Sequence, residues 1–121
     1  GDESGDLLVI GWGSTKGAIE EAVEIMRAEG VKVSSMHLAF LQPLPPGIKE
    51  AMQRFRKVIT IESNWCDRPE DELIDENNRR YSALAMMLRS RYLIDVDCWS
   101  EVKGQPIKPS IICGVIRNKL K

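Results

Sequence analysis

Apolar and polar positions follow two different periods along the chain. Short apolar runs, typical of buried parallel strands, occur over residues 6–10, 31–40, 57–61 and 93–99. Between and after them, apolar residues recur three or four positions apart, which predicts helices over 15–29, 46–55, about 78–90 and from 109 onward. An earlier start of the third helix, from residue 69, is an alternative. Strands that alternate with helices predict an α/β fold, with a mostly parallel sheet and helices on both faces.

Each predicted helix has one apolar stripe that should pack against the sheet. Gly30 follows the first helix as a C-cap glycine, and Pro109 begins the last helix, where the fixed φ of proline is favourable. The residues expected to point inward are Ala18, Ile19, Ala22, Val23 and Met26 in the first helix, Ile48, Met52 and Phe55 in the second, Tyr81, Leu84, Ala85, Leu88 and Tyr92 in the third, and Ile111, Ile112, Val115, Ile116 and Leu120 in the last.

The glycine turn 11–17 joins the first strand to the first helix. Glycine permits a sharp turn, and Ser14 or Thr15 can cap the helix. A helix N-terminus can also attract an anion, so a free-standing nucleotide- or anion-binding domain is one hypothesis. However, the third glycine comes one place too late for a dinucleotide fingerprint, and Lys16 precedes Gly17 where a P-loop needs the reverse. A capped strand-to-helix turn is the favoured interpretation of the turn alone.

Composition narrows the class of protein. A chain of 121 residues fits one domain, which we assign to residues 6–121, with 1–5 as a linker or domain edge. The net charge of −1 argues against a nucleic-acid surface, and no apolar run approaches the ~20 residues that span a bilayer. Cys66, Cys98 and Cys113 are too far apart to suggest a disulfide framework or an iron–sulfur cluster. These features indicate a cytoplasmic protein with reduced, partly buried thiols.

Candidate polar groups follow the predicted strands. Ligands approach an open α/β sheet at the carboxyl ends of its strands, and three of those ends carry polar or glycine residues, at 11–15, 62–64 and 100–101. Glu62 and Asn64 are the sharpest candidates for contact with a ligand or a neighbouring subunit, although capping of the strand end is favoured. His37 lies in an apolar strand, so a structural, hydrogen-bonded role is favoured over catalysis. Ser63 has no base to activate it, and no catalytic residue is predicted.

The segment 65–80 is the least ordinary part of the chain. It contains the acidic run 70–76, and Asp67 could cap a helix there. The carboxylates are not spaced as in a calcium-binding loop, so a solvated face is favoured and no metal site is predicted.

An ordered set of motifs resembles one enzyme family. The chain is similar to the C-terminal domain of the α subunit of 2-oxoacid:ferredoxin oxidoreductases, and the resemblance covers nearly its whole length. The motifs that carry it are Gly11-Trp12-Gly13-Ser14-Thr15 with Gly17, His37-Leu38, Leu41-Gln42-Pro43-Leu44-Pro45, Lys57-Val58-Ile59 followed by Glu62-Ser63-Asn64, the segment 84–89, and Gly104-Gln105-Pro106.

The resemblance implies a fold like the C-terminal domain of transketolase, a three-layer α/β/α sandwich with a mixed, mostly parallel sheet. It implies an oligomeric enzyme that oxidatively decarboxylates a 2-oxoacid with coenzyme A and passes electrons through iron–sulfur clusters to ferredoxin. The 2-oxoacid would be 2-oxoglutarate, pyruvate or a branched-chain acid. Thiamine diphosphate, Mg and the clusters would be held outside this domain, by the rest of the α subunit and by partner subunits, including a thiamine-diphosphate-binding β subunit.

Within that family the domain would serve subunit association and shape the edge of the active site. Its own residues at that edge would be Gly11, Trp12, Gly13, Ser14, Thr15, Glu62 and Asn64. One departure from the family pattern lies after the third strand, where the segment 65–80 intervenes and Tyr81-Ser82 stands in place of an expected Gly-Gln pair. Any role taken from that pair therefore does not transfer to this chain.

Overall fold

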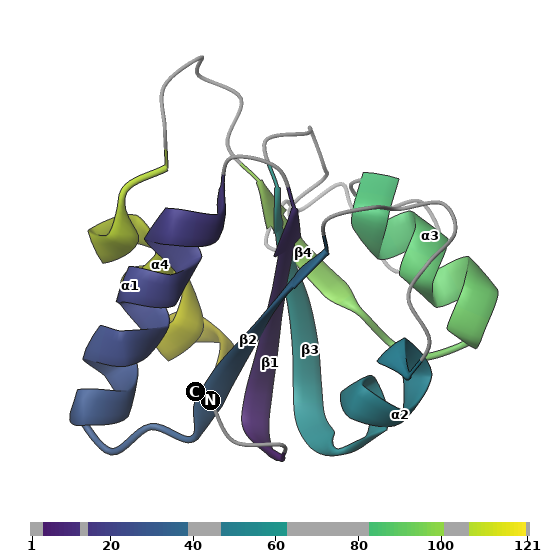
Figure 1. Cartoon of the computed structure of the whole chain (residues 1–121), viewed down its shortest axis with the longest axis horizontal. Helices are drawn as coiled ribbons and strands as arrows, with labels where there is room; N and C mark the ends of the chain where they lie inside the picture. The colour runs from purple at the N-terminus through teal and green to yellow at the C-terminus, as the bar shows by residue number, and fades with distance from the viewer. Residues whose placement is uncertain (1–3, 13–14, 39–46, 63–82, 101–106, 121) are drawn as a thin grey trace.

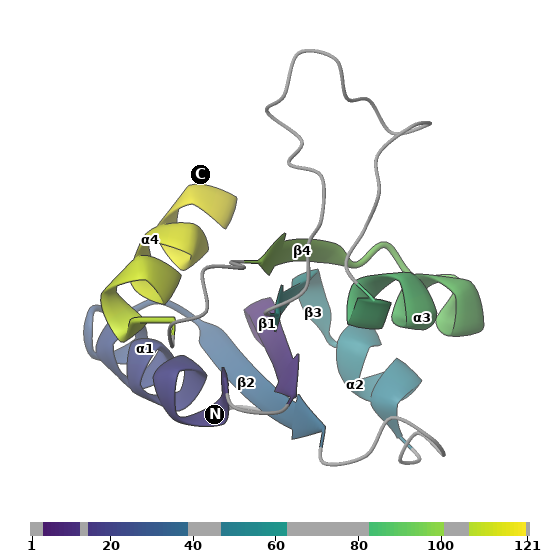
Figure 2. The same ribbon diagram turned by 90° about the horizontal axis from the view of Figure 1, so that it is seen from above.

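The chain forms three layers, with a four-stranded sheet between two pairs of helices (Figure 1). The computed structural model describes residues 4–12, 15–38, 47–62, 83–100 and 107–120. The strands are β1 (Gly5–Trp12), β2 (Val33–Leu38), β3 (Phe55–Glu62) and β4 (Asp97–Ser100). The helices are α1 (Lys16–Ala28), α2 (Ile48–Gln53), α3 (Ala83–Tyr92) and α4 (Pro109–Lys119). Figure 2 shows α1 and α4 on one side of the sheet and α2 and α3 on the other.

The sheet has the strand order β2-β1-β3-β4, and every neighbouring pair is parallel. The chain moves from β1 to β2 in one direction and then crosses β1 to reach β3. Because parallel crossovers are almost always right-handed, this reversal places α1 and α2 on opposite faces. The three-layer α/β/α prediction is confirmed. The four described strands are all parallel, and the antiparallel member implied by the family resemblance is not among the residues that the structure describes.

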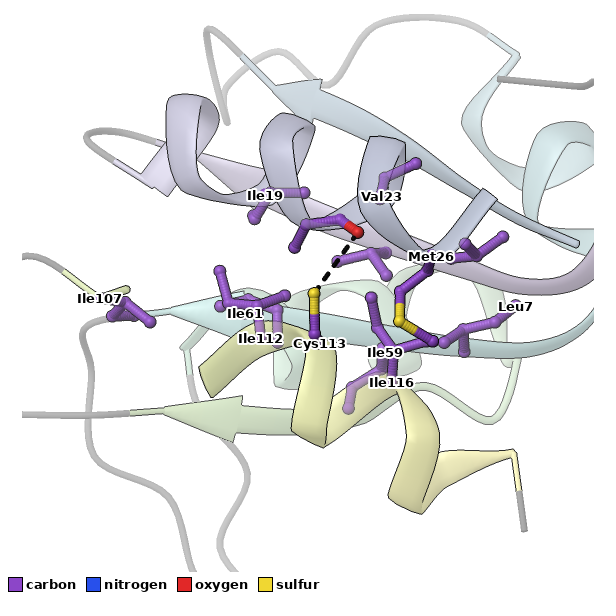
Figure 3. Packing of buried hydrophobic residues seen from close by; sticks show 13 residues of the cluster. Leu7, Ile19, Val23, Met26, Ile59, Ile61, Ile107, Ile112, Cys113 and Ile116 are labelled. Carbon is purple, nitrogen blue, oxygen red and sulfur yellow. Dashed lines mark hydrogen bonds between the residues drawn. The ribbon is translucent and has the colours of Figure 1, made fainter. Parts of the chain in front are cut away.

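Alternate residues of the strands supply the two cores. Leu7 and Val9 of β1 face α1 and α4, whereas Leu8 and Ile10 face α2 and α3. Both sets are buried, as expected for a central parallel strand covered on both sides. Figure 3 shows the core beneath α1 and α4, where side chains of β1 and β3 meet those of the two helices.

The helical stripes are largely confirmed, with two corrections. Buried positions include Ile19, Ala22, Val23 and Met26 of α1, Ile48 and Met52 of α2, Leu84, Ala85 and Leu88 of α3, and Ile112 and Ile116 of α4. Phe55 packs against the core as predicted, but it begins β3 and does not end the second helix, because α2 stops at Gln53 and the chain turns there. Ile111 was predicted to point inward, but it is 38% exposed, because the buried stripe of α4 includes Cys113 and is rotated toward that residue.

The last strand starts later than predicted. The apolar run 93–99 suggested a strand throughout, whereas β4 begins at Asp97. Leu93 has a positive φ of 56° directly after α3, and its backbone N–H donates to the Arg89 carbonyl oxygen. The Arg89 guanidinium also donates to the Val96 carbonyl oxygen at 3.1 Å. These bonds hold residues 93–96 as a connection between helix and strand, so apolar composition alone misplaced the boundary.

Gly30 ends α1 as predicted. Its φ is +88°, its N–H donates to the Arg27 carbonyl oxygen, and the Val31 N–H donates to the Met26 carbonyl oxygen. This pair of bonds is a Schellman motif, which satisfies carbonyls left over at a helix end. Tyr81, Pro43, Pro46, the segment 65–80 and the turn at 104–106 lie outside the described residues. Among the described helices, none is long and apolar enough to cross a membrane.

Candidate functional site

The candidate site is the edge of the sheet where the parallel strands end. The strand register aligns Gly11 of β1 with His37 of β2 and Ile61 of β3, and aligns Glu62 with Ser100 of β4. The chain reverses its direction of travel across the sheet between β1 and β3, and this switch point is where ligands bind in open α/β folds. The structure therefore brings the ends of β1, β3 and β4 to one edge, as predicted. Asn64 and Glu101 lie outside the described residues.

Gly11 leaves room for side chains of α1 and its N-cap against β1. A Cβ atom at Gly11 would overlap Ile19 Cδ1 and would lie 2.8 Å from Thr15 Oγ1. A side chain at position 11 would therefore force the side-chain ends of Ile19 and Thr15 to shift. Gly11 and Trp12 both belong to β1, so the strand continues into the motif that the sequence suggested as a turn.

Thr15 occupies the N-cap position of α1, as predicted, but it makes no capping hydrogen bond with its side chain. Its backbone has helical angles (φ −80°, ψ −9°), whereas a side-chain cap normally requires an extended residue. The prediction that Thr15 caps the helix is therefore wrong in its chemistry, although Thr15 is buried there. Ser14, the other predicted cap, and Gly13 lie outside the described residues.

Glu62 is bound by three hydrogen bonds at the described part of this edge. It is 1% exposed and its carboxylate accepts hydrogen bonds with both oxygens. Oε1 accepts from the Leu84 N–H at 2.9 Å, and Oε2 accepts from the Ala85 N–H at 3.3 Å and from the Thr60 hydroxyl at 2.8 Å. The first N–H groups of a helix have no partner within the helix, and its N-terminus favours negative charge. Glu62 thus binds the first turn of α3.

Thr60 is a residue that the sequence analysis missed. It is fully buried on β3 and lies two positions before Glu62, so both side chains point to the α2 and α3 side of the sheet. A hydroxyl two residues before a strand-end carboxylate is the signal that could have revealed the pair. Its hydroxyl bond restrains the Glu62 carboxylate toward α3.

His37 departs from its prediction. A structural, hydrogen-bonded role was favoured, yet its Nδ1 atom is buried and has no hydrogen-bond partner among the described residues. His37 lies beside Gly11 in the register of β1 and β2, at the same edge of the sheet. The expected hydrogen bond is therefore missing at Nδ1 among the described residues, and a structural role for His37 stays a prediction.

The two described cysteines lie on opposite faces of the sheet. Cys98 belongs to the core under α2 and α3, and Cys113 belongs to the core under α1 and α4. Both are free and buried, as predicted, and Cys113 Sγ donates to the Ala22 carbonyl oxygen at 3.6 Å (Figure 3). Burial raises the pKa of the Cys113 thiol above its usual 9.0, and the nearby Arg117 charge opposes this.

The described residues offer no ligand set for the metal ion or the iron–sulfur clusters that the family resemblance implies for the parent complex. Cys98 and Cys113 cannot ligate one iron–sulfur cluster, because the sheet separates them. Both Glu62 oxygens are engaged by the chain itself, and the part of the chain that the structure describes contains no group of three His, Cys, Asp or Glu side chains able to hold a metal ion.

Similarity to known proteins identifies the domain. Residues 5–106 match the family described as "Pyruvate:ferredoxin oxidoreductase core domain II". The chain belongs to this family. It is 38% identical over 121 residues to the 2-oxoglutarate oxidoreductase subunit KorA of Mycobacterium tuberculosis. That match covers 98% of the chain but 16% of KorA, so the chain spans about one sixth of the length of this relative.

Solved structures share the fold. The 2-oxoglutarate:ferredoxin oxidoreductase of Magnetococcus marinus, solved with 2-oxoglutarate, coenzyme A and succinyl-CoA, superposes with a TM-score of 0.80 at 24% identity, over 100% of this chain and 19% of that one. A split-gene transketolase, solved as an inactive tetramer of four beta subunits, superposes with a TM-score of 0.63 at 18% identity. The match covers 97% of this chain and 39% of that one. The predicted likeness to a transketolase domain is confirmed.

Proposed function

We propose that this chain is an assembly domain of the α subunit of a 2-oxoacid:ferredoxin oxidoreductase. It presents the carboxyl edge of its sheet to the rest of that enzyme and supplies no reacting group. The observation that carries the proposal is that groups at the switch point between β1 and β3 already contact other parts of the domain. There the space at Gly11 is filled by α1, and the Glu62 carboxylate is bound to α3. The groups best placed to meet a substrate are engaged in holding the domain together.

The whole enzyme would convert a 2-oxoacid and coenzyme A into an acyl-CoA and CO₂. The bond between the carboxylate and the keto carbon breaks and releases CO₂, the S–H bond of coenzyme A breaks and releases a proton, and a thioester forms. Two electrons leave for ferredoxin through iron–sulfur clusters. Thiamine diphosphate with Mg would supply the stabilisation of the carbanion, in a site formed outside this domain. We propose 2-oxoglutarate as the first substrate to test and pyruvate as the second, because KorA and the Magnetococcus marinus enzyme are both named for 2-oxoglutarate. The enzyme would be a cytoplasmic oligomer.

Turnover measurements test whether this domain supplies no reacting group and is nevertheless needed by the whole enzyme. The full α subunit, co-expressed with its β partner, should reduce a ferredoxin or dye acceptor when 2-oxoglutarate and coenzyme A are supplied. The 121-residue chain alone should be inactive with either 2-oxoacid. Turnover by the isolated chain would refute the proposal, as would a complex that keeps its activity after the domain is deleted.

The assembly role is tested at Trp12, the last residue of β1 at the proposed edge. We expect Trp12→Ala in the full α subunit to weaken association with the β subunit, measured by size-exclusion chromatography and by turnover at limiting β subunit. Glu24→Gln is the matched control, because Glu24 is exposed on the second half of α1, away from that edge. Unchanged association and unchanged turnover of Trp12→Ala would remove the glycine turn from the interface.

The alternative hypothesis of a nucleotide- or anion-binding module at residues 11–17 has a separate test. Calorimetric titration of the isolated chain with nucleotides, coenzyme A and thiamine diphosphate should detect no micromolar binding. A nucleotide that binds the chain alone with micromolar affinity would favour that alternative.

A further inference from the structure

We propose that the outer surface of α3, formed by Met86, Ser90, Arg91 and Leu93, binds another domain of the same α subunit, with Leu93 as the anchor. The proposal rests on the proposed function, because it takes the chain to be one domain of a longer subunit. Leu93 precedes the start of β4, so this surface is separate from the carboxyl edge of the sheet.

Leu93 is unusual in two independent ways. Its side chain is 88% exposed, and its φ is 56°. A left-handed backbone is unfavourable for a residue with a Cβ atom, so glycine or asparagine is usual directly after a helix. A side chain this exposed makes few contacts within the domain that could offset the cost. A backbone outlier of this kind indicates a function outside the domain's own packing.

The chain holds Leu93 in a fixed position. Its N–H donates to the Arg89 carbonyl oxygen at 2.9 Å, and the Arg89 guanidinium donates to the Val96 carbonyl oxygen at 3.1 Å. Tyr92 and Ile94, on either side of it in sequence, pack against the core under α2 and α3. A group that is already fixed loses little conformational freedom when a partner covers it, so Leu93 is suited to be an anchor.

Met86 lies on the same side of α3 as Leu93. Met86 is 51% exposed, and Ser90 between them is also exposed. Positions 86, 90 and 93 are spaced by four and three residues, which places them along one side of a helix. The other side of α3, with Leu84 and Leu88, faces the core. Apolar residues on both sides of a helix are typical of one that is covered on both sides.

The charge of this surface indicates the chemistry of its partner. The sequence has no Asp or Glu from residue 83 to residue 94, and Arg91 is exposed. We expect the partner to have an apolar patch that receives Leu93 and Met86, with a carboxylate facing Arg91. A twofold pairing of two copies would bring two basic surfaces together, which disfavours a second copy of this chain.

The size of the surface favours a domain of the same chain over a separate subunit. It has two exposed apolar side chains, whereas a stable interface between separate proteins has roughly 20–30 residues on each side. The match with KorA covers 16% of that relative, and the match with the Magnetococcus marinus enzyme covers 19% of its chain. A domain joined covalently has an effective concentration of order millimolar, so a small contact is sufficient.

Oxidation of methionine by hydrogen peroxide tests whether the surface is covered. We expect Met86 to be oxidised at least about fivefold more slowly in the α subunit alone than in the isolated 121-residue chain, with no further slowing when the β subunit is added. Met26, which is buried, should react slowly in every sample and is the internal control. Equal rates at Met86 in the chain and in the α subunit would overturn the proposal.

Two other outcomes would overturn it by assigning a different partner. Protection of Met86 that appears only with the β subunit would assign the surface to that subunit. Protection in the isolated chain that rises with protein concentration would assign it to a second copy. Neither outcome depends on turnover, so failure of this proposal is distinguishable from failure of the proposed function.

Photocrosslinking gives a second test that needs only the assembled complex. p-Benzoylphenylalanine in place of Leu93 should form a crosslink to a peptide of another α-subunit domain, identified by mass spectrometry. The same residue in place of Ile25, which is 42% exposed on α1, should not form that product. A crosslink from position 93 to the β subunit, or no crosslink at all, would contradict the proposal.

Leu93→Gly should have opposite effects in the two contexts. In the isolated chain it should raise the unfolding temperature by about 2–4 °C, because glycine tolerates a positive φ. In the α subunit it should speed the oxidation of Met86 by at least about threefold, because the anchor is lost. An unchanged rate in the α subunit would show that Leu93 anchors nothing.

Charge reversal tests the role of Arg91. Arg91→Glu in the α subunit should speed the oxidation of Met86, and Arg91→Lys should have a smaller effect. Lys49→Glu is the matched control, because Lys49 is exposed on α2 in the same layer. Equal effects of Arg91→Glu and Lys49→Glu would contradict a carboxylate facing Arg91.

Discussion

The two helical layers are held to the same sheet in different ways. In the layer of α1 and α4 the helices have 13 and 11 residues, and their ends are determined by neighbours in sequence, namely the Schellman motif at Gly30 and the proline that opens α4. In the layer of α2 and α3 the helices have 6 and 10 residues, and the first turn of α3 is bound by a side chain of β3. Among the described residues, local signals mark an end of α1 and of α4, whereas the first turn of α3 is bound by a long-range hydrogen bond.

Contacts at the end of α4 show that the first layer also has polar ties to the sheet. Lys57 Nζ of β3 donates to the Lys119 carbonyl oxygen at 2.8 Å, and Lys119 forms an ion pair with Asp97 of β4. The pair between Arg117 and Glu29 joins α4 to the end of α1, but both side chains are about half exposed, so it contributes little. These ties add to a layer that is already held by its apolar core, and the Glu62 bonds likewise add to the apolar core under α2 and α3.

The largest expected effect comes from truncation of each core. Ile116 and Leu88 are both fully buried, one in each layer, and each change to alanine should lower the free energy of unfolding by about 2–5 kcal/mol. Chemical denaturation of the two variants measures the difference. Ile25→Ala is the control, because Ile25 is 42% exposed on α1. A cost for Leu88→Ala no larger than that of Ile25→Ala would show that α3 does not depend on its apolar core.

Gly11→Ala should lower the free energy of unfolding by about 1–3 kcal/mol, because the added methyl group would overlap Ile19 and crowd Thr15. Gly17→Ala is the matched control within the same glycine motif. Nothing lies within 4 Å of a Cβ atom at Gly17 and the residue is helical, so alanine there should stabilise the chain by about 0.5–1 kcal/mol. If both substitutions had the same sign in thermal denaturation, the packing account of Gly11 would be wrong.

Gly30→Ala should cost about 1–2 kcal/mol, since φ of +88° is unfavourable for a residue with a Cβ atom. Gly114→Ala on α4 should instead stabilise by about 0.5–1 kcal/mol, because the site is open and helical. Urea denaturation of both variants compares the end of one helix with the middle of its neighbour. A neutral Gly30→Ala would indicate that the Schellman motif does not determine how α1 ends.

The smallest effect should come from the Cys113 thiol between α1 and α4. Its pKa is raised by burial, so above pH 9.0 the unfolded thiol ionises while the folded thiol keeps its proton. Stability should therefore fall as the pH rises, by at most about 0.8 kcal/mol at pH 9.5 from this group. Denaturation of wild type and Cys113→Ala between pH 8 and pH 9.5 measures this as a difference in slope. Parallel pH profiles would contradict it.

Several features of the fold could be predicted from the sequence because they depend on short-range periodicity. Alternation within strands and the spacing of Ile19, Ala22, Val23 and Met26 determine which faces are buried, and these were correct. The positive φ of Gly30 was also predictable, since many helices end at a glycine that adopts the left-handed conformation. The family motifs added the three-layer architecture, which the strand order confirms.

Other features required the folded chain. Periodicity assigned Phe55 to a helix when it belongs to β3, and it predicted that Ile111 is buried when it is exposed. The end of α2 and the rotation of α4 depend on what each helix packs against. The glycine motif drew attention to Gly11, but only the position of Ile19 in the folded chain shows that a side chain at position 11 would be crowded. Nor could it pair Glu62 with the first turn of α3, since a hydrogen bond across 22 residues leaves no local pattern. The spacing of apolar residues indicates which face of a helix or strand is buried, because that spacing is local in the sequence. The hydrogen-bond partners of Glu62 come from a distant part of the sequence, so only the folded chain shows them.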